Sequence, residues 1–352
     1  MQSIDPIQSA ELVGLRYVND DRPGIRRRAS EQGFIYIGTN GKPIRNAQEL
    51  KRIQALIIPP AWENVWICPS PDGHLQATGR DAKGRKQYRY HTDWRQIRSQ
   101  TKFEHMLQFG LALPKIREHT DRDLGLKGLC RDKVLATVVQ LLEKTLIRVG
   151  NSEYAEKNRS FGLTTLRNRH IEISGSTLKF QFRGKSGIDH DIELGDRRLA
   201  RIVKQCRDLP GYELFQYLDD EGQRQTIDSK DVNAYLRDIT NEDFTAKDFR
   251  TWGGTVKALL ALKAIGEFNS ETEAKKNITQ AVKDVARELG NRPATCRKYY
   301  IHPAILAAYI EGTLLSLAAE FDQSEAKLDH SDSKYNLHPE EQAVLALLEQ
   351  AI

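Results

Sequence analysis

The pattern of apolar and polar residues divides the chain near residue 92. Before that point the apolar residues fall in short β-branched and aromatic runs, such as GFIYIGTNGKPI at 33–44, which contains an Asn-Gly turn signal. Residues 64–81 predict two further strands around a Pro-Asp-Gly turn. We therefore expect a small β-rich N-terminal domain over residues 1–92.

Beyond that point the period changes to that of helices. In residues 93–120 and 131–151 the apolar residues recur every three or four positions. Residues 170–194 alternate apolar and polar positions between glycines, which predicts a small sheet of two or three strands. Four more helical patterns follow. The second domain, 93–317, is therefore expected to be mainly α-helical with one small β-sheet.

The final segment, 318–352, shows a helical pattern interrupted by a polar loop. Taken together, the patterns predict the α+β class, with a β-rich domain, a mainly helical domain and a partly helical tail. No internal repeat is visible along the chain.

Charge is distributed unevenly along the 352 residues. Residues 1–100 hold 16 Lys and Arg against 10 Asp and Glu, whereas residues 318–352 hold 2 against 8. A basic body suits a polyanionic partner, and nucleic acid first, although an ordinary solvated surface explains the same counts. The acidic tail leaves two alternatives open: it packs on the second domain, or it mimics DNA and weakens non-specific binding.

Composition also excludes several classes of protein. No apolar run approaches the roughly 18 residues needed to span a bilayer, and the start, MQSIDPIQSAEL, lacks the features of a signal peptide. The cysteines are widely spaced without a CxxC pair, which argues against structural zinc and disulfides. We expect a cytoplasmic, nucleoid-associated protein without a membrane partner. The cysteines are Cys68, Cys130, Cys206 and Cys296.

Motifs for nucleotide and metal chemistry are incomplete. Gly184-Lys185-Ser186 is half of a phosphate loop, but the first glycine would fall at Lys179 and no helix follows. The sequence has neither HExxH nor GxGxxG, and the acidic pair Asp121 and Asp123 sits in an ordinary charged turn. The sequence therefore predicts no nucleotide cofactor and no required metal.

Four polar residues in distinctive local settings remain, together with two adjacent tyrosines. Taken singly, each polar residue has an ordinary structural explanation: a cation at a helix C-terminus, a turn lysine, a stacked arginine and a C-cap asparagine. The tyrosines, in NRPATCRKYYIHP at 291–303, could equally be half-buried core aromatics. The four are Arg148 in LIRVGN, Lys185 in FRGKSG, Arg250 in TAKDFRTWGG and Asn291 after ARELG.

Their order along the chain favours a common function. The series resembles the active site of type IB DNA topoisomerases. It consists of an arginine, a hairpin lysine, a KxxR arginine, Leu-Gly-Asn and a tyrosine nine residues later. The segment GRDAKGRKQYRYH at 79–91 resembles the DNA-contacting segment of the poxvirus-like branch of that family. The resemblance runs from about Leu15 to Gly312, and the asparagine at 291 is bacterial in style.

The resemblance implies a role for each residue. Tyr300, which precedes Ile301 and, after one more residue, Pro303, is the expected nucleophile; Tyr299 is a neighbour. Tyr300 would attack phosphorus to give a 3′-phosphotyrosyl enzyme and a free 5′-hydroxyl. The linkage conserves the phosphodiester energy, so that religation needs no ATP.

The remaining catalytic residues would act on the charge and the leaving group. Arg148 and Arg250 would stabilise the charge on the non-bridging oxygens, because guanidiniums are forked and permanently protonated. Asn291 would donate one more hydrogen bond to the same oxygens. Lys185 would protonate the leaving 5′-oxygen as general acid.

DNA contacts are implied for the basic segment as well. Four cations there are expected to contact phosphates or guanine edges, and two tyrosines to offer hydroxyls and rings. The family pattern also implies a monomer whose two domains close around duplex DNA as a clamp and relax its supercoils. The residues are Lys83, Arg85, Lys86, Arg89, Tyr88 and Tyr90.

Two rival functions remain at this point. A tyrosine recombinase or integrase shares this catalytic chemistry, but recombinases typically carry HxxR where this chain has Lys247 and Arg250, and their N-terminal domain is usually helical. A non-catalytic DNA-binding protein would not need the intact series of five residues. A relaxation assay on supercoiled plasmid would separate these functions.

Overall fold

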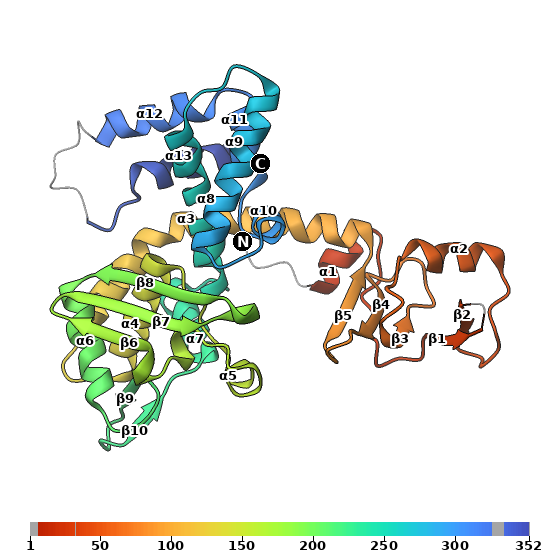
Figure 1. The fold of residues 1–352 in the computed structure, drawn as a ribbon, viewed down its shortest axis with the longest axis horizontal. Helices are drawn as coiled ribbons and strands as arrows, with labels where there is room; N and C mark the ends of the chain where they lie inside the picture. Colours follow the sequence, from red (N-terminus) through yellow and green to blue (C-terminus); the bar gives the residue numbers. More distant parts are fainter. Residues whose placement is uncertain (1–5, 32, 326–333, 352) are drawn as a thin grey trace. The chain divides into compact units, whose positions relative to one another are not determined.

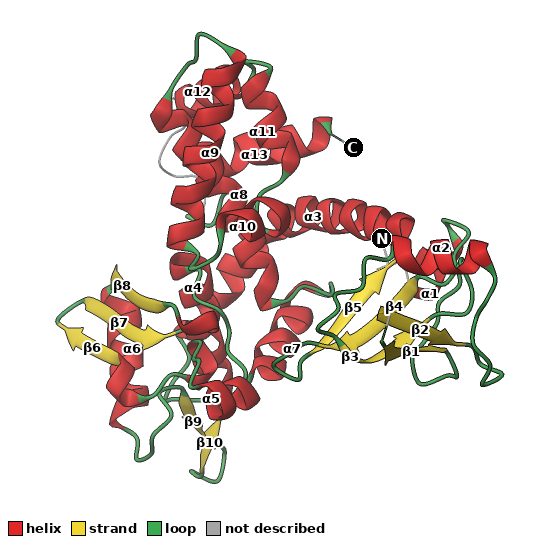
Figure 2. Ribbon diagram, turned by 45° about the vertical axis from the view of Figure 1, so that its right-hand side comes forward, coloured by secondary structure: helices red, strands yellow, loops and turns green. Residues whose placement is uncertain are grey.

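The computed structural model describes residues 6–31, 33–325 and 334–351, and the chain divides into two compact units, Met1–Lys102 and Phe103–Ile352 (Figure 1). Helices and strands occur in both units, and the N-terminal one holds a small sheet (Figure 2). The predicted mixture of helix and sheet is therefore confirmed at this level. The predicted boundary after residue 92 falls at the start of helix α3, Thr92–Leu124, which runs across the division between the units.

The first unit is built on an antiparallel five-stranded sheet in the order β2-β1-β3-β4-β5. Its core is small: Ile53 of helix α2 packs with Ile25, Val65, Ile67 and Ala77 of the sheet. Asn46 caps α2, because its side chain accepts hydrogen bonds from the backbone of the first turn. The elements are α1 (Pro6–Glu11), β1 (Ile25–Ser30), β2 (Gly33–Ile37), α2 (Ala47–Ala55), β3 (Glu63–Ile67), β4 (Leu75–Arg80) and β5 (Lys86–Tyr90).

The second unit is mainly helical. Helices α4 and α8 supply many of its fully buried side chains, and Figure 1 shows α8 and α9 side by side. The helices after α3 are α4 (Arg131–Thr145), α5 (Ser152–Asn158), α6 (Arg197–Asp208), α7 (Ser229–Thr240), α8 (Ala246–Ile265), α9 (Glu271–Glu288), α10 (Pro293–Tyr299), α11 (Pro303–Ile310), α12 (Leu314–Glu325) and α13 (Pro339–Gln350).

Two small antiparallel sheets complete the second unit. The first has the order β6-β7-β8, and the turn between β7 and β8 carries Lys185 at a hairpin tip. The second pairs two strands of three residues each, which are too short to show a period in the sequence. The strands are β6 (Ile171–Ser174), β7 (Thr177–Arg183), β8 (Asp189–Gly195), β9 (Gln216–Leu218) and β10 (Arg224–Thr226).

The end of the chain packs into the core of the second unit. Helix α13 buries Ala343, Val344, Leu347 and Leu348 there. Its buried Glu341 accepts two hydrogen bonds, of 2.8 and 2.9 Å, from the Arg117 guanidinium of α3. Helix α13 therefore follows the first of the two alternatives for the acidic tail: it packs on the second unit.

Length and apolar content together decide whether a helix could cross a bilayer. Within the described ranges, no single helix is both long and apolar enough to cross a bilayer. Helix α11 and Leu314–Gln323 meet the criterion of length and composition only as a pair, with a bend of 102° between them.

Candidate active site

Four of the five residues predicted to be catalytic come together in the second unit. They lie on segments that are far apart in the sequence: the residues after α4, the start of α8, the turn after α9 and the end of α10. Contacts among their side chains, given below, join them into one cluster. The four are Arg148, Arg250, Asn291 and Tyr300.

The segment that carries Arg148 is fixed through its backbone. Helix α4 ends because Leu146 adopts a left-handed conformation, with φ of 53°. The Arg148 carbonyl then accepts a hydrogen bond of 2.9 Å from Leu163 N–H. A Cβ at Gly162 would lie 2.4 Å from that carbonyl oxygen, so only glycine permits this close approach. The Arg148 side chain therefore starts from a rigid position.

Arg250 is buried, with 4% of its surface exposed. Its Nη1 donates to the carbonyl of Leu146, and its Nη2 donates to the carbonyl of Leu289 at 2.7 Å. The guanidinium therefore ties the end of α4 to the end of α9. In the described part of the chain, its buried Nε has no hydrogen-bond partner.

Two glycines after Arg250 let other segments approach helix α8. A Cβ at Gly253 would lie 2.6 Å from the Leu146 side chain, and one at Gly254 would lie 2.7 Å from the Tyr300 carbonyl oxygen. The Thr255 hydroxyl accepts a hydrogen bond of 3.1 Å from the backbone N–H of His302. The sequence RTWGGT thus combines an arginine with the packing surface that holds the tyrosine segment.

Asn291 follows a tight turn at Gly290, whose φ is 57°. Its backbone N–H donates to Ala286 O at 2.8 Å, and its Oδ1 accepts from Arg148 Nη2 at 2.5 Å. The amide nitrogen Nδ2 is buried and has no partner among the described residues. An unpaired buried donor costs about 1–3 kcal/mol, so this amide is well suited to bind an acceptor that arrives with a ligand.

The structure distinguishes the two adjacent tyrosines. Tyr300 is half-buried, and its side chain interacts electrostatically with both Arg148 and Arg250. The Arg250 guanidinium also lies 5.3 Å from the centre of the Tyr300 ring. Tyr299 is 48% exposed, and its ring lies 5.3 Å from Lys298 Nζ. Tyr300 is therefore the tyrosine that faces the cations.

Burial makes the two arginines unusual cations. It lowers the pKa of Arg250 to about 10, and the nearby Arg148 adds to that shift. Burial also lowers the pKa of Arg148, while the Tyr300 phenol acts in the opposite direction. Across the described ranges the two guanidiniums donate to carbonyl and amide oxygens, and neither pairs with a carboxylate. Two adjacent, partly desolvated cations without a counter-ion form a site that attracts an anion.

Among the described residues, no hydrogen bond or ring contact joins the Lys185 side chain to the other four residues. It is exposed in the β7–β8 turn, where Ser186 and Gly187 both have positive φ values of 65° and 76°. In the part of the chain that the structure describes, its ammonium forms no hydrogen bond and no ion pair. The predicted hairpin position is therefore present, whereas the predicted role as general acid stays a prediction.

His190 also belongs to this site, although the sequence did not predict it. Its ring stacks on Phe182 across the β7–β8 hairpin, with centroids 4.9 Å apart and planes 14° apart. Burial lowers its pKa to about 4, and the charges of Arg148 and Arg250 add to that shift. No motif marks this histidine, but the pairing of a predicted hairpin would have placed it opposite Phe182.

The residues predicted to contact DNA lie in and before strand β5 of the first unit. Tyr88 and Tyr90 share one face; their rings are 6.0 Å apart and nearly parallel, and they are 47% and 37% exposed. Lys86 lies on the same face, where its Nζ pairs with Asp20 at 2.6 Å. This face presents two aromatic rings and a cation to solvent.

The other three predicted DNA contacts have different surroundings. Lys83 is exposed in the β4–β5 turn, and Arg85 pairs with Asp81 at 2.6 Å. Arg89 lies on the opposite face of β5, donates to the Ile57 carbonyl at 2.8 Å and lies over the Trp62 ring. Because strand side chains alternate, Arg89 is separated from the tyrosine face.

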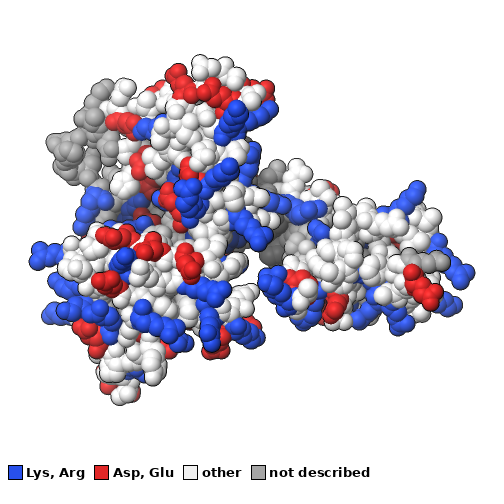
Figure 3. All heavy atoms as spheres, viewed as in Figure 1, with Lys and Arg blue, Asp and Glu red and all other residues white. Residues whose placement is uncertain are grey.

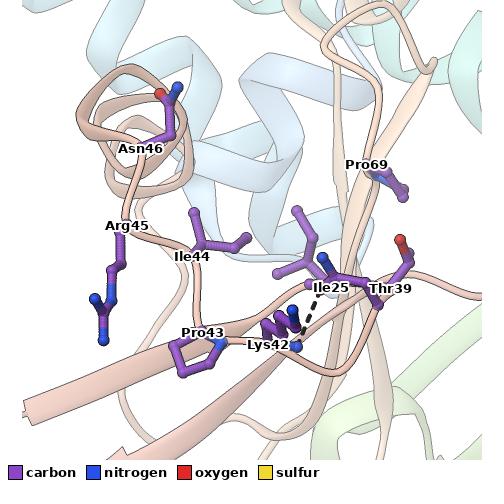
Figure 4. Close-up of a pocket in the computed structure, with 10 residues that line it drawn as sticks. Ile25, Thr39, Lys42, Pro43, Ile44, Arg45, Asn46 and Pro69 are labelled. Atoms are coloured by element: carbon purple, nitrogen blue, oxygen red, sulfur yellow. Dashed lines mark hydrogen bonds between the residues drawn. The ribbon is translucent and has the colours of Figure 1, made fainter.

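Two hollows of the surface do not contain the cluster. One, of about 280 Å³, lies in the first unit between Ile25, the 38–46 loop and Pro69 (Figure 4). The other, of about 500 Å³, lies beside α6 and is basic. Its charged lining residues are Arg197, Arg198, Arg201 and Lys204. Figure 3 shows Lys and Arg interspersed with Asp and Glu over the region of β6–β8 and α6.

Comparison with known proteins defines the class. The family model described as the catalytic core of eukaryotic DNA topoisomerase I matches residues 91–326, and the model of the bacterial DNA topoisomerase IB N-terminal domain matches residues 33–81. The class is thus that of an isomerase that acts on DNA. DNA topoisomerase 1B of Acanthamoeba polyphaga mimivirus is 33% identical over 293 residues, which cover 81% of this chain and 87% of the relative.

A more distant relative extends the same pattern. DNA topoisomerase 1B of vaccinia virus (strain Copenhagen) is 24% identical over 252 residues, which cover 70% of this chain and 76% of the relative. The chain belongs to the type IB DNA topoisomerases, and the predicted family and enzyme class are confirmed. Its substrate is accordingly duplex DNA.

Proposed function

We propose that this enzyme relaxes supercoiled duplex DNA by transient cleavage of one strand, with Tyr300 as the nucleophile. The Tyr300 hydroxyl gives up its proton to water as its oxygen attacks the scissile phosphorus, the bond from phosphorus to the 5′-oxygen breaks, and a 3′-phosphotyrosyl linkage forms. The observation that carries this proposal is the convergence of Arg148 and Arg250 on the Tyr300 side chain. Religation reverses the same step when the 5′-hydroxyl attacks the linkage.

The two guanidiniums and one amide supply the electrostatic part of the mechanism. In the transition state, negative charge grows on the non-bridging oxygens of the phosphate. Arg148 and Arg250 are already desolvated and held by backbone carbonyls, so they need little reorganisation to bind that charge. The unpaired Asn291 Nδ2 supplies one further donor. The same cations favour the developing charge on the phenol oxygen of Tyr300.

The leaving 5′-oxygen needs a proton, which we assign to Lys185. Its ammonium is exposed at the tip of a hairpin and has no competing carboxylate partner among the described residues. When the 5′-oxygen leaves, one ammonium proton passes to it, and religation returns that proton to the lysine. No step in this scheme uses a nucleotide or a metal ion.

Substrate binding is proposed to involve both units of a monomer. The tyrosine face of β5 offers rings and hydroxyls to the DNA backbone, with Lys83, Arg85 and Lys86 as phosphate or base contacts. The units would close around the duplex, and the free 5′ strand would rotate about the intact one. We further propose that the second unit has the catalytic fold shared by tyrosine recombinases and type IB topoisomerases; its mainly helical build with two small sheets supports this.

A plasmid relaxation assay tests this function. The wild-type enzyme is expected to relax positive and negative supercoils in excess EDTA and without ATP. Complete dependence on magnesium would contradict the mechanism. Resolution of two separate DNA sites into recombinant products, without relaxation of a single plasmid, would favour the recombinase function instead.

A further inference from the structure

His190 lies at a junction between two functional segments of the second unit. A Cβ at Gly184, directly before Lys185, would lie 2.6 Å from the His190 ring. A Cβ at Gly290, directly before Asn291, would lie 2.5 Å from the same ring. The imidazole therefore rests against the backbone of both glycines. Its ring thus contacts both the hairpin that carries Lys185 and the turn that carries Asn291.

The ring is also held in orientation. On the hairpin side it stacks on Phe182, its partner in the β7–β8 register, at 4.9 Å between centroids. The charged groups that face it are Arg148 and Arg250 from the cluster and Asp189 from its own strand. The two arginines and burial favour the neutral ring over the imidazolium. A neutral, flat ring can fill the narrow space between two backbones without adding a third cation to the site.

The position of Lys185 has to be set by contacts outside its own side chain. Its own ammonium has no partner in the described ranges, so its side chain does not fix the position of the hairpin. The turn closes on itself, because Gly184 N–H donates to Ile188 O at 2.7 Å and Gly187 N–H donates to Gly184 O at 3.1 Å. These bonds shape the tip. A further bond, from Phe161 N–H to Arg183 O at 2.8 Å, holds the end of β7, and the His190 ring adds the contact with the Asn291 turn.

We infer that His190 is a positioning residue, which holds the β7–β8 hairpin against the Asn291 turn and thereby sets the reach of the Lys185 ammonium toward the leaving 5′-oxygen. This inference rests on the proposed function, since it requires Lys185 to be the general acid. A displacement of about 1 Å at a reacting group can cost about 10²-fold in rate. Loss of the contact between the His190 ring and the two glycine backbones is expected to displace the hairpin by a distance of that order.

The test measures single-turnover cleavage at saturating enzyme. His190→Ala is expected to slow cleavage of an ordinary phosphodiester by about 10²-fold, while DNA affinity is unchanged. A substrate with a 5′-bridging phosphorothiolate has a leaving group that needs little protonation. It is expected to restore cleavage by His190→Ala to near the wild-type rate.

Two comparisons make the test specific. In the double variant His190→Ala/Lys185→Ala, the ordinary substrate is expected to be cleaved as slowly as by Lys185→Ala alone, because both changes remove the same proton transfer. The matched control is Ile192→Ala, two residues along β8, which removes apolar packing from the same strand. The control is expected to lower stability and leave the cleavage rate unchanged.

A second variant keeps the inference testable if His190→Ala does not fold. Gly184→Ala places a methyl group against the ring at a backbone φ of −94°, which any residue tolerates. It is expected to slow cleavage and to be rescued by the phosphorothiolate in the same way.

Three results would overturn the inference. Equal slowing on both substrates would show that His190 acts on the attack step, through the arginines, rather than on the hairpin. Additive losses in the double variant would show that it acts independently of Lys185. If Lys185→Ala itself is not rescued, the general-acid assignment fails, and the inference that depends on it fails as well.

Discussion

Arg27 of the first unit and Arg250 of the second have similar hydrogen-bond partners but different surroundings. Each guanidinium is held by backbone carbonyls: Arg27 by those of residues 58–60 and 62, and Arg250 by Leu146 and Leu289. Arg27 also stacks on the Phe34 ring at 4.2 Å. Arg250 instead faces the Tyr300 side chain and keeps a buried Nε without a partner in the described chain.

These surroundings distinguish a structural cation from a functional one. A guanidinium whose surroundings are a loop and an apolar ring stabilises that loop. A guanidinium with an unused donor, a second cation and a phenol beside it is prepared for an anion. Carbonyl contacts alone, which both arginines share, do not distinguish the two roles.

The largest expected effect separates the two tyrosines of the second unit. Tyr300→Phe removes one oxygen and keeps the ring, so it is expected to abolish plasmid relaxation while folding and DNA binding are retained. Tyr299→Phe is expected to keep relaxation, because its side chain lies outside the arginine cluster. Full activity of Tyr300→Phe would show that Tyr300, the tyrosine beside the two arginines, is not the nucleophile.

The next prediction tests the two arginines directly. Arg250→Lys is expected to slow cleavage at saturating enzyme by about 10²–10³-fold, because a lysine loses the fork that binds both carbonyls and the phosphate. Arg27→Lys, its matched control, is expected to lower the free energy of unfolding by about 1–3 kcal/mol and leave the cleavage rate unchanged. Equal effects of the two substitutions on cleavage would remove the distinction drawn here.

DNA affinity provides a third comparison, between the exposed β4–β5 turn and the buried cluster. Lys83→Ala is expected to weaken binding and to reduce the slope of log K against log salt by about 0.9, the value for one phosphate contact. The cleavage rate at saturating enzyme is expected to stay the same. An unchanged slope, measured by fluorescence anisotropy over a salt series, would show that Lys83 contacts no phosphate.

The smallest expected effect is a difference in pH response between the units. In the second unit a hydrogen bond with Asp248 raises the pKa of His105, whose Nε2 lies 3.5 Å from the carboxylate. The contribution of protonated His105 to the free energy of unfolding is therefore present below the unfolded pKa of about 6.5. It is lost as pH rises through the raised pKa of the folded state. In the first unit burial lowers the pKa of His74, so that its contribution is lost as pH falls.

Urea denaturation of two variants checks these signs. His105→Gln is expected to lower the free energy of unfolding more near pH 5.5 than near pH 8.5. His74→Gln is expected to lower it more near pH 8.5 than near pH 5.5. These two pH values lie about one unit or more on either side of the unfolded pKa. The same pH trend for both variants would contradict the assignment of opposite shifts.

Local sequence patterns predicted much of the fold. Strands β2, β3 and β4 of the first unit, the helical period after residue 92 and the β7–β8 hairpin follow from short-range alternation and turn signals. The short pair β9 and β10 did not, because three residues carry too little periodicity. The packing of α13 also could not be read locally, since it depends on Glu341 meeting Arg117 from the distant helix α3.

The site was predictable to a different degree. Tyr88 and Tyr90 share a face because they are two residues apart on one strand, and alternation alone separates them from Arg89. The convergence of Arg148, Arg250 and Asn291 required tertiary structure, and the sequence pointed to it only through the family resemblance. His190 was missed because its significance lies in two glycine backbones that approach it from other segments.

The most direct test of the account is to identify the residue that carries DNA in the covalent intermediate. The wild-type enzyme is incubated with a suicide substrate that loses its 5′ strand, denatured in detergent, digested and mapped by mass spectrometry. The account predicts a nucleotide adduct on Tyr300, joined through a 3′-phosphate, and none in Tyr300→Phe. An adduct on Tyr299, or an adduct that persists in Tyr300→Phe, would contradict it.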